Sequence, residues 1–396
     1  MTEKRKSPAL RFRGYTDDWE QRKLGDVVQI TMGQSPDGST YSDEPSDYIL
    51  VQGNADLQNG WVCPRIWTTQ ITKKVDAGDL IMSVRAPAGA MGKTAYNAVI
   101  GRGVAAIKGN EFIYQLLVKM DTDGFWKTLS CGSTFESLNS DNIKNAEVKI
   151  PTTAEQIKIG GFFQYLDNLI TLHQRKLEKL KLVKKSMLEK MFPKNGSSVP
   201  EIRFKGFTED WEQRKLGEIL QERNTRTSDF ESNPLYSLTI ESGVTPKTDR
   251  YERSSLVTKT EDLFKIVKPN EFVTNPMNLR FGALGYNRNA FTVSVSGYYD
   301  VFSIDDDKCS GFWNSYFKTL TAMNIFDNAA TGSLIEKRRV KYSTLQQLAF
   351  YMPNDLSEKA EIGKYMDTFD NLITLHQRKV EKLKILKKSM LEKMFV

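Results

Sequence analysis

The sequence predicts a mixed α/β protein built from two tandem units that share one fold and are separated by two long antiparallel helices. Three observations predict this fold class. A short leading motif occurs twice, a lysine-rich segment occurs twice, and strand-like and helix-like runs alternate in the blocks between them. Two like helices in one chain most simply pair with each other as an antiparallel coiled coil, which gives the chain the pseudo-two-fold symmetry of a dimer.

Length and composition limit the classes of protein to consider. A chain of 396 residues suggests two or three domains. No apolar run approaches the length of about 18 residues that a membrane span needs, and the first ten residues are too polar for a signal peptide. Three scattered cysteines without a C-x-x-C pair favour a reducing cytoplasm over a disulfide frame or a zinc site. We therefore expect a cytoplasmic protein with no membrane partner.

The net charge of +7 is distributed unevenly along the chain. Its surplus of lysine and arginine lies in the repeated lysine-rich segments and in the first residues, whereas the two large blocks are neutral or slightly acidic. A basic chain of this kind is compatible with nucleic-acid binding.

Two repeats define the organisation of the chain. The leading motif Phe12–Gly25 matches Phe204–Gly217 at 11 of 14 positions, and the lysine-rich segment Asp167–Phe192 matches Asp370–Phe395 at 23 of 26 positions. Units of this length are duplicated domains and not the short repeats of a solenoid. The predicted segments are a first block with its leading motif at 1–151, a helix at 152–192, a linker at 193–203, a second block with its leading motif at 204–353 and a second helix at 354–396.

Each lysine-rich segment predicts a long helix with a heptad seam, because its core positions recur at steps of four and three. The helices are expected over 154–192 and 354–396. The seam is Leu166, Ile170, His173, Leu177, Leu180, Lys184, Met187 and Met191 in the first copy, and Phe369, Ile373, His376, Val380, Leu383, Lys387, Met390 and Met394 in the second.

Polar residues interrupt both seams at equivalent positions, His173 with His376 and Lys184 with Lys387. Polar seam residues are typical of coiled coils that fix their register or partner, and a metal ion bridging the two histidines is the alternative. The identity extends to outward positions such as Lys176, which packing within the seam does not require. Two identical outer surfaces are therefore expected to dock two copies of one partner.

The two blocks have the mixed pattern of α/β domains. Strands are expected in 48–53, 78–86 and 298–304, and helical spacing appears at Phe112, Leu116, Leu117 and Met120 and again at Trp313, Phe317 and Leu320. Gly160 and Gly363 occupy equivalent places near the starts of the long helices and are expected to kink or thin them.

The sequence contains no complete catalytic motif. The run 89–94, "GAMGKT", ends like a phosphate-binding loop, but Pro87 stands where that loop needs its first glycine. The run 275–278, "NPMN", lacks the second proline and the aromatic residue of the N-P-P-F box of amino-methyltransferases, and no glycine-rich loop for a methyl donor follows a strand. We therefore expect that this chain is not an enzyme.

Several motifs together resemble one family along nearly the whole chain. They are "DWEQRKLGDV" (18–27), "GQSPDG" (33–38), "GDLIMSVRAPAGAMGK" (78–93), "AEQIKIGGFFQYLDNLI" (154–170), "NPMNLRFGALG" (275–285) and "SVSGYYDVF" (294–302). No single motif is specific, but their doubled order resembles the specificity subunit of type I restriction-modification systems, HsdS.

The resemblance implies a division of labour between the segments. Each block is expected to be a target recognition domain that reads one half of a bipartite, asymmetric sequence in double-stranded DNA. The helices are expected to set the spacing and to dock two modification (methyltransferase) subunits, which restriction subunits with translocase and endonuclease activity then join. S-adenosylmethionine, ATP and magnesium are expected on those partner subunits and no cofactor or metal on this chain.

Candidates for DNA contact follow from the residue types that read bases and grip phosphates. In the first block they are Gln34, Ser35, Arg65, Arg85, Lys93, Ser133 and Thr134. In the second block they are Arg223, Asn224, Arg226, Asn278, Arg280, Arg288, Ser333, Lys337, Arg338 and Arg339. The last three belong to the basic cluster 336–341, for which phosphate contact is expected.

Two other functional classes remain open from the sequence. A stand-alone DNA-binding regulator would use the same two readers but bind tightly without partners. A scaffold protein built on the paired helices would show no sequence-dependent DNA binding.

Overall fold

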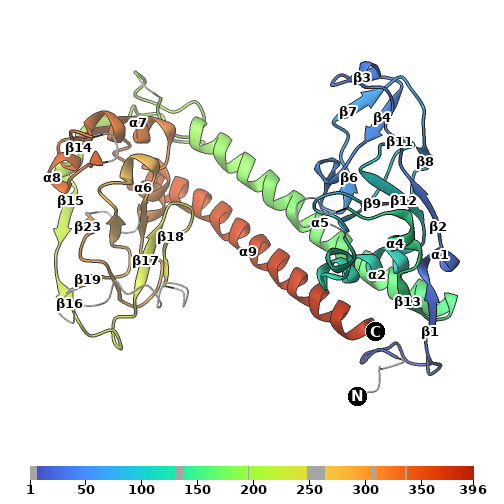
Figure 1. Cartoon of the computed structure of the whole chain (residues 1–396). Helices are drawn as coiled ribbons and strands as arrows, with labels where there is room; N and C mark the ends of the chain where they lie inside the picture. The colour runs from blue at the N-terminus through green and yellow to red at the C-terminus, as the bar shows by residue number, and fades with distance from the viewer. Residues whose placement is uncertain (1–6, 131–136, 195, 248–263, 306–308, 335–336) are drawn as a thin grey trace. The chain divides into compact units, whose positions relative to one another are not determined.

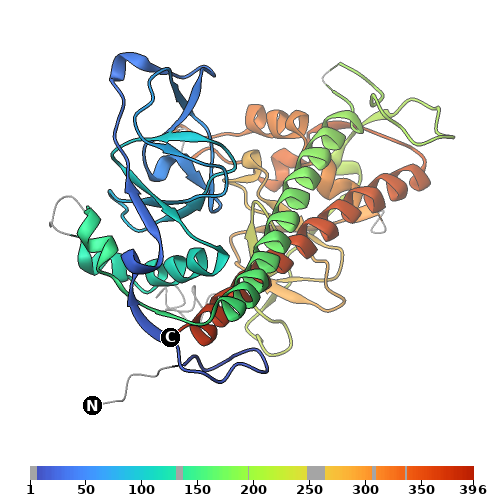
Figure 2. The ribbon, with the colours of Figure 1, turned by 90° about the vertical axis from the view of Figure 1, so that its right-hand side faces the viewer.

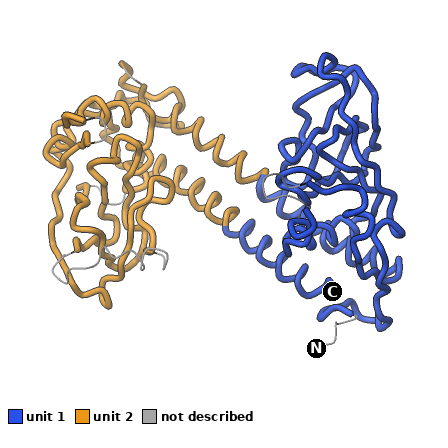
Figure 3. Tube along the Cα trace, viewed as in Figure 1, with its two compact units in different colours: residues 1–174, 378–396 blue, residues 175–377 orange. Residues whose placement is uncertain are grey.

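The computed structural model describes residues 7–130, 137–194, 196–247, 264–305, 309–334 and 337–396 (Figure 1). The chain forms two compact units (Figure 3), unit 1 with residues 1–174 and 378–396 and unit 2 with residues 175–377. The two units do not coincide with the two tandem repeats, because each long helix is divided between unit 1 and unit 2. Helix α5 (Thr153–Lys190) begins in unit 1 and ends in unit 2, and helix α9 (Leu356–Met394) does the reverse.

Unit 1 contains two main sheets and a short ladder. The larger sheet has the order β2-β12-β9-β10-β6-β5, formed by Gln29–Met32, Val104–Lys108, Leu80–Ser83, Met91–Lys93, Trp61–Val62 and Leu57–Gln58. The second has the order β3-β7-β4-β11-β8, formed by Tyr41–Ser42, Ile66–Thr68, Tyr48–Val51, Ala98–Ile100 and Lys74–Val75. The ladder joins β1 (Glu20–Lys23) in the first leading motif to β13 (Glu147–Ile150), the last strand before α5.

Unit 2 repeats the central part of this arrangement. Its main sheet has the order β15-β23-β20-β21, formed by Leu220–Arg223, Asp300–Ile304, Phe272–Thr274 and Leu284–Tyr286. Smaller sheets are β16-β19-β22 (Arg226–Thr227, Phe264–Val267, Val293–Val295), β17-β18 (Tyr236–Thr239, Gly243–Pro246) and β14-β24 (Glu212–Lys215, Ala349–Met352). The four strands of the main sheet are all antiparallel and correspond in order to β2-β12-β9-β10 of unit 1.

Both units also contain short helices. In unit 1 they are α1 (Leu24–Val27), α2 (Glu111–Thr122), α3 (Phe125–Leu129) and α4 (Ser140–Lys144), with 3-10 turns η1 (Gly38–Thr40) and η2 (Asn54–Asp56). In unit 2 they are α6 (Ser310–Tyr316), α7 (Leu320–Ala329) and α8 (Tyr342–Leu345), with η3 (Leu216–Glu218) and η4 (Leu279–Phe281). None of the helices in the described ranges is long and apolar enough to cross a membrane.

The strands and helices that the sequence predicts are present, with one difference. The three predicted strands contain β4, β9 and β23, and the first helical pattern is α2. The second pattern, from Trp313 to Leu320, is broken into α6 and α7. Thr319 causes the break, because its hydroxyl accepts a hydrogen bond from Ala322 N and thereby caps a new helix.

The two long helices run antiparallel within each unit. In unit 1 the Asp167 carboxylate of α5 accepts hydrogen bonds from Lys387 Nζ of α9 at 2.7 and 2.9 Å. In unit 2 the equivalent residues pair the other way round, Lys184 of α5 with Asp370 of α9. Figure 2 shows the last turns of α9 (red) beside the first turns of α5 (green) in unit 1. Each of the sixteen predicted seam positions is buried or half-buried.

The end of α9 completes the core of unit 1. The Phe395 ring stacks on the Phe112 ring of α2, with centroids 5.2 Å apart, and meets the Trp19 indole of the first leading motif edge-on at 6.2 Å. Trp19, Phe112 and Phe395 are each no more than 4% exposed. The first block therefore packs around a side chain that follows the second block in the sequence.

The end of α5 completes the core of unit 2 in the same way. The Phe192 ring stacks on Tyr316, with centroids 4.8 Å apart, and lies 5.4 Å from Phe312 and 6.4 Å from Trp211. Phe192 and Trp211 are the repeat equivalents of Phe395 and Trp19. The exchange of helix ends is thus reciprocal.

A buried ion pair attaches the segment before each leading motif to the start of a long helix. Arg11 donates two hydrogen bonds of 2.8 Å to Glu155, and Arg203 donates hydrogen bonds of 2.6 and 2.8 Å to Glu358. Both glutamates are 1% exposed. Bidentate arginine–carboxylate contacts fix orientation as well as distance. Each ion pair therefore holds the start of a leading motif against the first turn of a long helix.

The glycines near the starts of the long helices allow close packing. A Cβ on Gly160 would lie 2.8 Å from the backbone nitrogen of Phe112, and a Cβ on Gly363 would lie 2.7 Å from that of Phe312. The start of α2 or α6 therefore rests directly on the long helix, and a side chain would push the two elements apart.

We predict that Gly160→Ala lowers the free energy of unfolding by about 1–3 kcal/mol, the usual cost of overpacking. Gly161→Ala is the matched control, because nothing lies within 4 Å of the added Cβ. Alanine in place of an exposed helical glycine should raise stability by up to about 1 kcal/mol. Urea unfolding of the full chain, followed by circular dichroism, measures both. Equal effects of the two changes would contradict the close contact.

Candidate nucleic-acid interface

A polar cleft of about 550 Å³ opens in the first block. It is lined by Ser35, Pro36, Gly38, Tyr41, Gln52, Arg85, Arg102 and Gly103. Ser35 and Arg85 are predicted contact residues, and the structure brings them together although 50 positions separate them in the sequence. Gln34 is exposed on the same loop.

Two arginines give the cleft its charge. Arg85 and Arg102 are both exposed, and neither forms an ion pair with any residue of the described ranges. Ser35, Tyr41 and Gln52 contribute hydroxyl and amide groups. Arginine, serine and glutamine are side chains that read base edges and hold phosphates, so the cleft has the chemistry of a DNA contact.

Closely spaced backbone segments form the floor of the cleft. The Arg102 amide donates to Ser35 Oγ at 3.2 Å, and the Gln34 amide donates to the Ile100 carbonyl at 2.9 Å. A Cβ on Gly103 would lie 2.0 Å from the Gln52 carbonyl oxygen. Only glycine permits this approach, and the resulting contacts hold the arginine backbone in a fixed position.

Arg65 and Asp56 hold the backbone at Gln52, one of the residues that line the cleft. The buried Asp56 carboxylate accepts hydrogen bonds from the amides of Gln52 (2.7 Å) and Gly53 (3.2 Å) and from Arg65 Nε (2.9 Å). Arg65 Nη2 lies 2.8 Å from the same carboxylate. The guanidinium therefore neutralises Asp56, while about half of the Arg65 side chain stays exposed.

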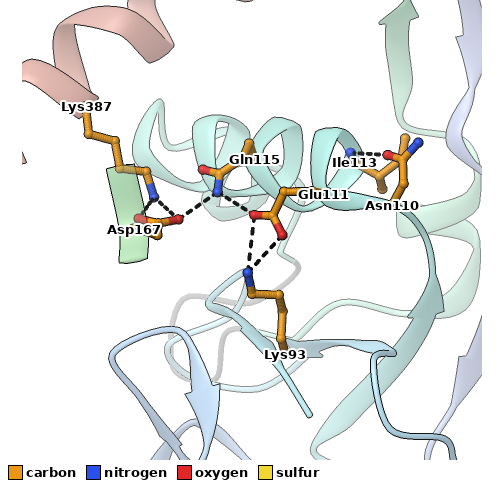
Figure 4. Close-up of polar contacts among 7 residues, drawn as sticks. All are labelled: Lys93, Asn110, Glu111, Ile113, Gln115, Asp167 and Lys387. Atoms are coloured by element: carbon orange, nitrogen blue, oxygen red, sulfur yellow. Dashed lines mark hydrogen bonds and ion pairs between the residues drawn. The ribbon is translucent and has the colours of Figure 1, made fainter. Parts of the chain in front are cut away.

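Lys93 belongs to a polar network that ties the first block to the long helices (Figure 4). Lys93 Nζ contacts the Glu111 carboxylate at 2.9 and 3.2 Å. Gln115 Nε2 then donates to both Glu111 and Asp167 at 2.8 Å, and Asp167 accepts from Lys387. Because the Lys93 side chain is only 11% exposed, the structure gives it an anchoring position.

Most candidates of the second block are on the surface. The exposed ones are Asn224, Arg226, Asn278, Ser333, Lys337 and Arg339. Arg223 and Arg288 are also exposed, but both are paired. The Arg223 guanidinium lies 3.4 Å from Glu271 and donates to Ser303 at 2.9 Å. Ser133 and Thr134 of the first block lie outside the described residues.

Arg288 has an anchoring position in the second block, as Lys93 has in the first. Its Nη2 lies 2.9 Å from Asp367 and 3.0 Å from Asp370 on α9, and its guanidinium stacks over Tyr286. Burial alone would lower the pKa of Arg288, but Tyr286 and the two carboxylates outweigh it and raise the pKa. Arg288 therefore stays charged and anchors the block to α9.

The same cluster perturbs its other members. Burial would raise the pKa of Asp370, but Lys184 and Arg288 outweigh it and lower the pKa. Burial lowers the pKa of Lys318 to about 8, with a further contribution from the positive charge of Lys184. Asp370 is therefore ionised at neutral pH and accepts hydrogen bonds from both α5 and the block.

Arg280 and Arg338 flank Asp327 at the end of α7. Arg280 Nη1 lies 3.1 Å from the Asp327 carboxylate and is 10% exposed. Arg338 donates to the Asp327 carbonyl at 2.7 Å and to the Ala330 carbonyl at 3.1 and 3.2 Å. Cations stabilise the carbonyl end of a helix, so Arg338 caps α7 while its neighbour Arg339 remains exposed.

Comparison with known proteins decides the family. The model of the type I restriction modification DNA specificity domain matches residues 16–182 and residues 208–384, which together make up most of the chain. The chain belongs to this family. It contains two specificity domains, each of which includes most of a leading motif, a block and much of the following long helix.

Named relatives support the same assignment. The chain is 30% identical over 182 residues to a protein of Methanocaldococcus jannaschii assigned as the MjaX specificity subunit of a type I restriction enzyme. That match covers 43% of this chain and 42% of the relative. The chain is 26% identical over 235 residues to the MjaIX specificity subunit of the same organism, with 52% of each protein covered. Each match thus spans about half of the relative's length.

A solved structure shares the fold. The crystal structure of the type I restriction-modification system S subunit from M. genitalium matches with a TM-score of 0.71, covering 98% of this chain and 99% of that chain. The sequence identity is 12%, so the likeness concerns the fold alone.

The first specificity domain also presents residues that sequence reasoning missed. Arg102 and Gln52 line the cleft but are absent from the predicted contacts. Arg102 had a local signal, because an arginine between Gly101 and Gly103 at the start of a buried strand marks a tight turn that projects one side chain. Gln52 had none, since only the fold brings it to the cleft.

We predict that Arg338→Ala affects stability whereas Arg339→Ala affects DNA binding. Arg338→Ala removes three hydrogen bonds from the end of α7 and should lower the free energy of unfolding by about 1–3 kcal/mol. Arg339→Ala should leave stability unchanged, weaken DNA binding for all sequences, and reduce the slope of log affinity against log salt by about 1. Urea unfolding and salt titrations of DNA binding by the assembled complex measure both. A changed target sequence in Arg339→Ala would show that it reads bases.

Proposed function

We propose that the chain is the DNA sequence-specificity subunit of a type I restriction-modification complex. Each specificity domain reads one half of a bipartite, asymmetric target in double-stranded DNA. One observation carries the proposal: two domains with the same central sheet order and the same anchoring contacts expose different side chains at equivalent positions.

The loop after the first strand of the main sheet gives one example. The two leading motifs are 192 residues apart, and at this offset Gln34 is equivalent to Arg226. Both side chains are exposed, Gln34 after β2 and Arg226 after β15. Since glutamine pairs best with adenine and arginine with guanine, two domains that differ here support recognition of two different half-sites.

The long helices fit the role of spacer and dock. Residues on their outer face are identical in the two copies and exposed in both, such as Leu172 with Leu375 and Lys176 with Lys379. Their exposure means that packing within the chain does not explain their identity. Two equal surfaces suit two copies of the modification subunit, which restriction subunits then join.

The proposed complex places the reaction chemistry on the partners. The modification subunits would bind S-adenosylmethionine and methylate adenine, and the restriction subunits would use ATP and magnesium for translocation and cleavage. This chain would catalyse neither step and would act in the cytoplasm. A stand-alone regulator with two DNA-reading heads, or a scaffold, would need no such partner.

We predict that the purified chain neither methylates nor cleaves DNA, and that methylation appears when a modification subunit is added. Methylome sequencing of cells that express both proteins should reveal one bipartite motif with adenine methylation in each half. Methylation by the chain alone, free of contaminants, would refute the non-catalytic role. Tight, sequence-dependent DNA binding without the partner would favour the regulator.

We predict that the long helices set the gap between the half-sites. One heptad inserted after Gln174 and one after Gln377 keeps the seam and both aspartate–lysine pairs, because each pair lies to one side of the insertion. Seven residues add about 10 Å of helix, so the gap should widen by about three base pairs at about 3.4 Å each.

The half-site sequences should stay the same in this variant, because no reader moves relative to its own block. The control is one heptad in a single helix, which puts the seam out of register and should abolish activity. An unchanged gap in an active double insertion would show that the helices are not the spacer.

A further inference from the structure

We propose that the polar cleft of the first specificity domain is a base-reading site in which Arg102 recognises a guanine of its half-site. The proposal rests on the proposed function and names the residue and the base class that determine one half of the target. Guanine presents two acceptors, N7 and O6, in the major groove, and arginine is the side chain that most often binds both.

The Arg102 guanidinium is available to a ligand. Of the basic candidates in the first domain, Lys93 pairs with Glu111 and Arg65 pairs with Asp56. Arg102 is exposed at the mouth of the cleft and has no carboxylate partner within the described residues. An arginine that is not paired with a carboxylate can direct both ends of its guanidinium fork to a ligand.

The backbone around Arg102 is held in place on both sides. The Gly101 amide donates to the Val51 carbonyl at 2.8 Å, and the Gly103 carbonyl accepts from the Val84 amide at 2.9 Å. The Arg102 amide itself donates to Ser35 Oγ. A reader whose backbone is fixed by three neighbouring segments loses little conformational freedom when it binds, which favours discrimination between bases.

The second specificity domain has no side chain at the equivalent position. The two leading motifs are 192 residues apart, which makes Ile30 equivalent to Glu222. Ile30 pairs with Ile107 and Glu222 pairs with Phe302, so these strands align with an offset of 195 residues and Arg102 is equivalent to Gly297. A position that carries arginine in one domain and glycine in the other, on a common backbone frame, is expected of a specificity determinant.

The test is methylome sequencing of cells that express the Arg102→Ala chain together with its modification subunit. The guanine at one position of one half-site should become degenerate, and methylation of the original target should fall about 10- to 100-fold, as loss of a bidentate base contact predicts. The other half-site and the gap serve as internal controls and should not change.

Two further variants separate charge from base recognition. Arg102→Lys keeps the positive charge without the planar fork and should retain most of the affinity while still relaxing the motif. Arg13→Ala removes an exposed arginine of the first leading motif, outside the cleft, and should leave the target sequence unchanged. Thermal unfolding of each purified chain confirms that the fold is intact.

Three results would overturn the proposal. They are a wild-type half-site without any guanine, an unchanged target in Arg102→Ala with uniformly lower activity, and an unchanged target with unchanged activity. Failure of the proposed function would look different, because the wild-type complex itself would then yield no bipartite target.

Discussion

The last phenylalanine of each long helical segment packs into the core of the opposite repeat's block, and the rest of the structure depends on this contact. Phe395 stacks on Phe112, and Phe192 stacks on Tyr316. Burying a phenylalanine contributes about 1.5–3 kcal/mol, so neither block completes its core from its own repeat. The Asp167–Lys387 and Lys184–Asp370 pairs fix the register of α5 against α9, and this register places each phenylalanine ring in its core.

The basic residues of the two domains serve two purposes. Lys93, Arg288 and Arg338 pair with carboxylates or helix carbonyls and hold the blocks together or onto the helices. Arg102 and Arg339 are exposed without a carboxylate partner in the described ranges and remain available to a ligand. This separation explains how blocks without a net positive charge can still present positive charge where DNA would bind.

Much of the fold was predictable from the sequence. Heptad spacing predicts long helices that pair, and the repeats predict two domains of the same fold. The antiparallel helices and the α/β blocks follow from such patterns. The site was less predictable, because the role of an arginine depends on its neighbours in space. Arg288 and Arg102 look alike in the sequence, and only the fold places two aspartates beside the first and an open cleft beside the second.

The exchange of helix ends also orders events during synthesis. Unit 2 is continuous in the sequence, from 175 to 377, and can close as soon as its last residue leaves the ribosome. Most of unit 1 is synthesised first, but its core lacks Leu391, Met394 and Phe395 until these residues have been made. The aromatic core of the first block therefore stays incomplete until then, and a truncation before Leu391 would damage the first block.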